Sequence, residues 1–206
     1  NPISWAYQGG WYIDRYSGGT LNVTGGEIEG SSNGIDSYGG HLVNISGGHI
    51  KGVNNAGLVA RGTTNITGGV IEGATYGVYS SGNTTIGEDD GTVSIDEPVL
   101  KGDLYGLYIE TGTLNFNDGI LKGITDAYYG QITNIPNRTE IFYDQERIGN
   151  YDYHTAYLLT ETVIAINTTT NVEYTNLQDA IDECKTDETV KLLANVPLYY
   201  EVTKNN

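Results

Sequence analysis

The chain has 206 residues, which is enough for one or two domains with a buried core, and it contains 29 Gly and 17 Tyr but only 2 Phe and no Met. This abundance of glycine and tyrosine, with 38% apolar residues, disfavours disorder and favours tightly turned β-structure. The net charge of −16 argues against nucleic acid and anionic membrane surfaces as partners, because both would repel the chain.

The sequence shows neither a membrane-inserting segment nor a targeting signal. No apolar run approaches the roughly 18 residues that a spanning helix needs, and the N-terminus NPISWAYQGG lacks the basic and then apolar order of a signal peptide. We therefore expect a mature product or a piece of a longer protein, with targeting signals, anchoring signals and further domains elsewhere in the parent chain. The single cysteine, Cys184, permits no intramolecular disulfide.

A phrase of alternating apolar and polar residues, closed by a glycine, recurs along the first two thirds of the chain. The closing glycines are Gly30, Gly52, Gly73, Gly102 and Gly123, at spacings of 22, 21, 29 and 21 residues. This is the period of a solenoid. Windows so short and so rich in glycine cannot hold two helices, so helical repeats are excluded.

Aligning the phrases on these glycines produces apolar columns. Because stacked coils place equivalent residues above one another, each column is predicted to face the interior. The columns are Ile28, Ile50, Ile71, Leu100 and Leu121; then Ile35, Leu58, Val78, Leu107 and Tyr128; and the pairs Leu21/Val23, Val43/Ile45, Thr64/Ile66, Thr84/Ile86 and Leu114/Phe116.

Residues 1–135 are therefore predicted to form an all-β, right-handed parallel β-helix with coils of about 21 residues. Successive coils should pair in parallel about 4.8 Å apart. The glycine pairs at positions 25–26, 47–48 and 68–69 are expected at corners, where glycine adopts a positive φ without steric cost. The fourth coil is longer than its neighbours, and we expect the acidic stretch 87–97 to leave the stack as a loop or hairpin.

The repeat fades after residue 135. Residues 136–160 are interpreted as a connecting segment, and residues 161–206 as a small ββαββ unit that caps the solenoid or begins a further β-helix. In this α+β unit, the stretch NLQDAIDECKT is predicted to form a short amphipathic helix with Thr175 or Asn176 as its N-cap. Its apolar face, expected to be buried, consists of Leu177, Ala180, Ile181 and Cys184.

The phrases LNVTGGEIEG, VNISGGHIKG and TNITGGVIEG resemble the pectin-lyase-like right-handed parallel β-helix regions of adhesin-like surface proteins from Gram-positive gut bacteria. The stretch VEYTNLQDAIDECKTDETVKLLANV resembles the segment that begins such a helix, where a short amphipathic helix caps the first coil. The resemblance implies an extracellular, cell-surface location. It specifies activity weakly, because this solenoid carries lyases, hydrolases, adhesins and phage fibres.

An enzyme of this fold would need acidic side chains and a basic group gathered on one face. In the enzymes of the family, lyases combine calcium-binding carboxylates with an arginine base, and hydrolases combine aspartates from adjacent coils with a histidine and an arginine or lysine. Here no arginine or histidine shares a column with paired aspartates. We predict no catalytic residue, and we expect His41, His49 and His154 at the surface.

No cofactor or metal is expected. The densest group of oxygen ligands is the acidic run at 88–90 with Asp96 and Glu97, and its spacing matches no dedicated calcium loop. We interpret it as a solvated acidic turn, with a calcium site as the alternative.

Two further outward columns are predicted, and the charged one would mainly fix the register of the coils. One is a ladder of side-chain amides that hydrogen-bond along the stack, and the other is a charge ladder whose exposed pairs each contribute only about 0–1 kcal/mol. The amide ladder contains Asn22, Asn44, Asn65 and Asn115, with Thr85 in the fourth coil, and the charge ladder contains Glu29, Lys51, Glu72, Lys101 and Lys122.

Tyrosines form the outward columns with the clearest binding potential. Tyr79, Tyr108 and Tyr129 share one register, and Tyr76 and Tyr105 share another. Aromatic rings can stack on the apolar face of a sugar, whereas a ladder that only stabilises the coils is the alternative. The candidate ligand-binding residues are Tyr79, Tyr108 and Tyr129. We predict that any glycan-binding surface includes Tyr79 and Tyr108, and that the rings at these two positions remain accessible to solvent.

These patterns favour a non-enzymatic extracellular module of a bacterial cell-surface, adhesin-like protein. It would serve as a stalk or as a binding surface for glycans or surface proteins of host or microbial origin. The alternative is a carbohydrate-active enzyme, either a polysaccharide lyase or a glycoside hydrolase, of the pectin-lyase-like fold. Ice binding is disfavoured because Thr24, Ser46 and Thr67 provide only a single column of hydroxyls.

Overall fold

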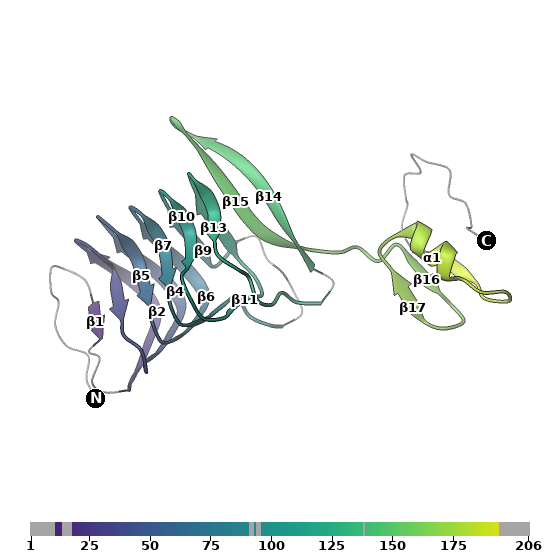
Figure 1. Cartoon of the computed structure of the whole chain (residues 1–206), viewed down its shortest axis with the longest axis horizontal. Helices are drawn as coiled ribbons and strands as arrows, with labels where there is room; N and C mark the ends of the chain where they lie inside the picture. The colour runs from purple at the N-terminus through teal and green to yellow at the C-terminus, as the bar shows by residue number, and fades with distance from the viewer. Residues whose placement is uncertain (1–10, 14–17, 91–92, 94–95, 138, 194–206) are drawn as a thin grey trace. The chain divides into compact units, whose positions relative to one another are not determined.

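The computed structural model describes residues 11–13, 18–90, 93, 96–137 and 139–193. The chain divides into two compact units, one up to Leu159 and one from Thr160. The first unit is a parallel β-solenoid of about five turns, and the second adds a few antiparallel strands and a short helix. The prediction of a parallel β-helix with a small C-terminal α+β unit is therefore confirmed (Figure 1).

One sheet of the solenoid contains six parallel strands, and each coil contributes one of them. Figure 1 shows these strands side by side in the order in which the chain forms them. They are β1 (Trp11–Ile13), β3 (Ile35–Ser37), β5 (Ala56–Ala60), β7 (Tyr76–Ser80), β10 (Tyr105–Ile109) and β13 (Asp126–Tyr129).

The other solenoid sheet has nine strands and is built in two ways. In the first coils a single strand of 11 residues forms each rung: β2 (Thr20–Gly30), β4 (Leu42–Gly52) and β6 (Thr63–Gly73). In the later coils the rung is divided into a pair of short strands, β8 (Asn83–Ile86) with β9 (Val99–Gly102), and β11 (Leu114–Phe116) with β12 (Ile120–Gly123). The front half of β6 pairs with β8 and its rear half with β9.

The glycine pairs bend the long strands, as the sequence predicts. Gly26, Gly48 and Gly69 have φ values of +83°, +96° and +86°, which side chains other than glycine rarely adopt. The pairing register shifts next to each pair, so the corner is a bulge within a continuous strand. In the fourth coil the rung is interrupted between Ile86 and Val99, and the loop or hairpin predicted there lies partly outside the described residues. Within the described part, Glu97 Oε2 accepts a hydrogen bond from Gly69 N at 2.8 Å.

The predicted interior columns are confirmed residue by residue. Ile28, Ile50, Ile71, Leu100 and Leu121 are partners in successive strands, and the last four are fully buried. The second column pairs in the same way from Ile35 to Tyr128. Each apolar side chain packs on its equivalents in the neighbouring coils, which is why a repeated phrase is sufficient to build a continuous core.

Residues 136–160, interpreted from the sequence as a connection, contain two long strands, β14 (Thr139–Ile148) and β15 (Tyr151–Thr160). The strands are neighbours in the nine-stranded sheet, and β15 pairs antiparallel with β12 of the last coil. Ala156 and Leu158 on β15 are fully buried and belong to the solenoid core. The hairpin therefore ends the parallel stacking and covers the interior at that point.

The C-terminal unit contains β16 (Ala165–Asn167), β17 (Val172–Tyr174), α1 (Leu177–Glu183) and β18 (Val190–Leu192), and its sheet is antiparallel in the order β17-β16-β18. The N-cap of α1 is Asn176, whose side chain accepts a hydrogen bond from Gln178 N at 2.8 Å. The fourth strand predicted for this unit lies outside the described residues.

The predicted burial of the apolar helix face is wrong in part. Among the residues described in α1 only Ala180 is buried, whereas Leu177, Ile181 and Cys184 are partly exposed. The buried core of this unit consists of Ala165, Tyr174 and Ala180. Within the described residues of this unit, a three-stranded sheet and a helix of 7 residues offer too little area to cover larger side chains.

Candidate ligand-binding surface

Five tyrosines from three successive coils lie on the outer face of the six-stranded sheet. Tyr79 on β7, Tyr108 on β10 and Tyr129 on β13 are register partners, as predicted. Tyr76 and Tyr105 are partners in the second predicted register. Val78 and Leu107, which directly precede Tyr79 and Tyr108, point into the core and are fully buried, so Tyr79 and Tyr108 point outward. Tyr76 and Tyr105 lie on the same outer face, because their rings contact those of Tyr79 and Tyr108. We call these five residues the tyrosine face: Tyr76, Tyr79, Tyr105, Tyr108 and Tyr129.

The rings of the tyrosine face form two stacked columns that contact each other. Tyr79 and Tyr108 have centroids 5.5 Å apart and an interplanar angle of 5°, and Tyr108 and Tyr129 have centroids 4.9 Å apart at 10°. The second column, Tyr76 over Tyr105, is also near-parallel, with centroids 6.4 Å apart. Rings of different columns meet at tilts between 46° and 53°. Both arrangements are favourable for aromatic pairs.

None of the five rings is buried. Four are half-buried, and Tyr129 is 52% exposed. The sequence analysis required accessible rings for a binding role, and Tyr79 and Tyr108 meet that condition.

Glu110, which directly follows β10, interacts with Tyr79 and changes the pKa of its hydroxyl. Its hydrogen bond to the Tyr79 hydroxyl, together with desolvation and its negative charge, raises the pKa of Tyr79 to about 12. Glu110 itself is exposed. The Tyr79 hydroxyl is therefore held protonated and directed to a carboxylate.

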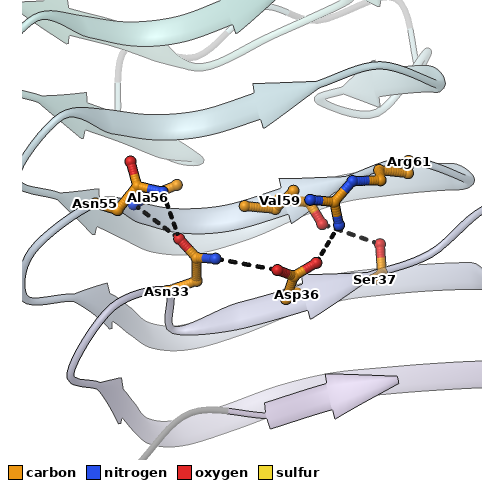
Figure 2. Close-up of polar contacts among 7 residues, drawn as sticks. All are labelled: Asn33, Asp36, Ser37, Asn55, Ala56, Val59 and Arg61. Carbon is orange, nitrogen blue, oxygen red and sulfur yellow. Dashed lines mark hydrogen bonds and ion pairs between the residues drawn. The ribbon is translucent and has the colours of Figure 1, made fainter. Parts of the chain in front are cut away.

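A polar cluster lies on the neighbouring coils of the same sheet (Figure 2). Arg61, just after β5, forms an ion pair with Asp36 on β3, and its guanidinium lies 4.8 Å from the centroid of the Tyr38 ring. Asn33 Nδ2 donates to Asp36 at 3.1 Å, and Asn33 Oδ1 accepts from Asn55 Nδ2 at 2.9 Å. Asp36 belongs to the same register as Tyr79, with Val59 between them.

Sequence reasoning missed this cluster and the partnership of Glu110 with Tyr79. Column alignment places Asp36 opposite Val59, but the ion pair of Asp36 runs diagonally to Arg61, outside any column. The available signal was Arg61, one of four arginines in an acidic chain, within reach of an aspartate in the preceding coil.

The amide ladder on the nine-stranded sheet is confirmed. Asn44 Nδ2 donates to Asn22 Oδ1, and Asn65 Nδ2 donates to Asn44 Oδ1, both at 2.9 Å. At the far end, Asn134 Nδ2 donates to Asn115 Oδ1 at 2.7 Å and extends the ladder by one member. The amide side chains hydrogen-bond to one another along the stack, so these donors and acceptors are already paired within the ladder.

The charge ladder is also confirmed. Lys51 Nζ lies 3.4 Å from Glu29, and Lys101 Nζ lies 3.0 Å from Glu72. Burial alone would raise the pKa of Glu72, but the hydrogen bond and charge of Lys101, with a smaller effect of His49, lower it below the ordinary value. Lys122 pairs instead with Glu146 of the hairpin strand β14 at 3.1 Å.

One expectation about the histidines is wrong. His41, expected at the surface, is 4% exposed, and its Nδ1 accepts a hydrogen bond from Gly19 N at 3.1 Å. It occupies a corner of the second coil, where a polar side chain that accepts a main-chain hydrogen bond can be buried. His49 and His154 are partly exposed, and His49 lies 3.4 Å from Glu72.

Two shallow grooves accompany these faces. One, of about 640 Å³, follows the corner beside the tyrosine face and is lined by residues that include Arg61, Ser81, Asn83 and Thr111. The other, of about 490 Å³, lies over the amide ladder, with Glu88 and Asp89 in its lining. Within the described residues, no group of three or more His, Cys, Asp or Glu side chains is arranged to hold a metal ion.

Comparison with protein-family models, with curated proteins and with solved structures found no significant match. In the part of the chain that the structure describes, no helix is long and apolar enough to cross a membrane.

Proposed function

We propose that this chain is a non-enzymatic, extracellular module of a cell-surface, adhesin-like protein, and that the tyrosine face is its binding surface for a glycan or a surface protein. The observation that carries the proposal is the gathering of five half-buried or exposed tyrosine rings on one outward face. Tyrosine offers a large amphipathic contact area, and it loses little conformational entropy on binding.

The solenoid supplies the rigid support that such a surface needs. Each coil adds about 4.8 Å along the axis, and the core columns fix every outward side chain in register with its neighbours. A set of ring centroids spaced 4.9–6.4 Å apart therefore requires little reorganisation on binding.

The negative net charge of the chain limits the kinds of ligand that the tyrosine face can be expected to bind. With 26 acidic and 10 basic residues, the chain repels polyanions at low and moderate salt. This favours neutral glycans or basic protein surfaces.

Two of the carboxylates near the tyrosine face are already engaged with other side chains, which supports a binding role over a catalytic one. Asp36 is paired with Arg61, and Glu110 is hydrogen-bonded to Tyr79. Hydrolysis of a glycoside by the usual route needs a carboxylic acid and a second carboxylate placed on either side of the scissile bond. The resemblance of the coil phrases to adhesin-like β-helix regions supports the same choice and the cell-surface location.

The proposal is tested by presenting the whole chain to an array of glycans and to immobilised surface proteins. The double variant Tyr79→Ala/Tyr108→Ala should weaken binding at least about tenfold, or about 1.4 kcal/mol, with an unchanged circular dichroism spectrum. The control is Asn44→Ala/Asn65→Ala on the other sheet, which should bind like the wild type.

Two outcomes would overturn the proposal. One is ligand binding that is the same in the wild type and in the tyrosine double variant. The other is release of unsaturated products or reducing ends from polygalacturonate or a related glycan, with turnover that disappears when a carboxylate is replaced.

A further inference from the structure

Because the rings of the tyrosine face stack on one another, their faces are not equally accessible to a ligand. Tyr108 lies between two near-parallel rings, Tyr79 at 5.5 Å and Tyr129 at 4.9 Å. On the other side of Tyr79, the register places Val59, which is only 3% exposed. The faces of the inner rings are therefore covered by neighbours in the column, and these rings present edges and hydroxyls to solvent.

Tyr129 differs because it stands at the end of its column. It lies on β13, the last strand of the six-stranded sheet. Within the described residues its ring contacts Tyr105 and Tyr108, both from the preceding coil. Its opposite ring face carries no further aromatic partner in that part of the chain, and 52% of the residue is exposed.

This distinction matters for sugar recognition. A pyranose contacts an aromatic side chain through its apolar C–H face, which is attracted to the negative face of the ring and not to its positive edge. The ring edges of Tyr79 and Tyr108 are poorly suited to this contact. We infer that the open ring face of Tyr129 is the subsite on which a neutral pyranose stacks.

The inference rests on the proposed function and narrows it to one ligand class. A neutral sugar is favoured because Asp126, on the strand that carries Tyr129, is exposed, and Glu110 follows the adjacent strand. These carboxylates, in a chain of net charge −16, would repel a uronic acid or a sulfated sugar.

The remaining tyrosines position the subsite. Tyr108 and Tyr105 hold the Tyr129 ring from one side, at 4.9 Å and 5.7 Å. The adjacent residue, Tyr128, is anchored to the hairpin, because its hydroxyl lies 2.7 Å from the Tyr143 hydroxyl. The open ring is therefore fixed before a ligand arrives, which reduces the entropy lost on binding.

The test measures the affinity of the whole chain for soluble oligosaccharides by isothermal titration calorimetry. The probes are oligosaccharides of glucose, galactose, mannose and N-acetylglucosamine. Oligogalacturonate serves as the charged counterpart of the galactose probe. We expect at least one neutral probe to bind, and Tyr129→Ala to weaken that binding at least about tenfold. Tyr129→Phe keeps the ring face and should stay within about threefold of the wild type.

The matched control is Tyr151→Ala, which removes a tyrosine that is 59% exposed and lies outside the tyrosine face. It should bind like the wild type. If Tyr129→Ala binds like the wild type while Tyr79→Ala/Tyr108→Ala does not, the subsite is wrong and the proposed function stands. If none of the neutral probes binds, the subsite is wrong. The proposed function is then tested separately by the array of glycans and surface proteins described above. Tighter binding of oligogalacturonate than of the galactose probe would overturn the ligand class.

Discussion

The two sheets of the solenoid use their outward columns differently. On the nine-stranded sheet, Asn44 bonds to equivalent amides on both sides, and Lys51 pairs with Glu29 of the adjacent coil. On the six-stranded sheet, one outward column passes through the register positions of Tyr12, Asp36 and Val59. It consists of tyrosine from β7 to β13 and ends at an exposed ring. The columns of the nine-stranded sheet pair their own polar and charged groups, whereas the tyrosine column ends in exposed aromatic surface, which we propose as the ligand-binding surface.

The interior column of the nine-stranded sheet that contains Ile71 should show the largest effect on stability. Ile71 is fully buried between Ile50 and Leu100, so Ile71→Ala should lower the free energy of unfolding by about 2–5 kcal/mol. The measurement is urea denaturation followed by circular dichroism. Val53→Ala, at a site that is 41% exposed, should stay within about 0.5 kcal/mol of the wild type. Equal effects of the two variants would contradict the register.

The amide ladder should show an intermediate effect that depends on position. Asn44 both donates and accepts within the ladder, so Asn44→Ala should lower the free energy of unfolding by about 1–2 kcal/mol, since each bond contributes about 0.5–1.5 kcal/mol. Asn22 accepts a single bond from the ladder, so Asn22→Ala should cost about half as much. A larger loss of unfolding free energy in Asn22→Ala than in Asn44→Ala would contradict the amide ladder.

On the tyrosine face, Glu110 should control the titration of Tyr79. Because the folded pKa of about 12 lies above the ordinary value of 10, the stabilisation from this hydrogen bond is complete below pH 10 and is lost as the pH rises from 10 to about 12. Glu110→Gln should move the pKa of Tyr79 toward 10 and shift this loss to lower pH. Ultraviolet titration of tyrosinate measures the change, with Glu140→Gln, outside the tyrosine face, as the control. An unchanged titration curve in Glu110→Gln would show that Glu110 does not raise the pKa of Tyr79.

The charge ladder should show the smallest effect. Lys51 and Glu29 are both largely exposed, so Lys51→Ala should lower the free energy of unfolding by less than about 1 kcal/mol. Molar salt should remove most of the difference from the wild type, because it screens exposed charges. A difference that persists in molar salt would show that packing of the lysine stem, and not its charge, is responsible.

The interior columns and the outward amide and charge ladders could be predicted from the sequence because coils repeat, so one alignment places every equivalent residue. Three features do not repeat and were therefore missed. The antiparallel pairing of β15 with β12 follows from no coil phrase, His41 is buried at a corner instead of in a column, and Arg61 reaches Asp36 diagonally.

For the candidate site, the sequence was sufficient to place Tyr79, Tyr108 and Tyr129 in one register. It could not show that their rings would stack face to face, because ring orientation depends on side-chain torsions and neighbouring rings. This is why the sequence singled out Tyr79 and Tyr108, whereas the geometry singles out Tyr129, the one ring of this register at the end of the stack.

The central claim, that the tyrosine face binds the ligand and the amide face does not, is tested most directly by nuclear magnetic resonance. A ligand found on the array would be titrated into protein labelled in tyrosine rings and asparagine amides. The account predicts shifts confined to the tyrosine face and greatest at Tyr129, with Asn44, Asn65 and Tyr151 unchanged. Shifts concentrated at the asparagine amides of the amide ladder, with the tyrosine rings unchanged, would contradict it.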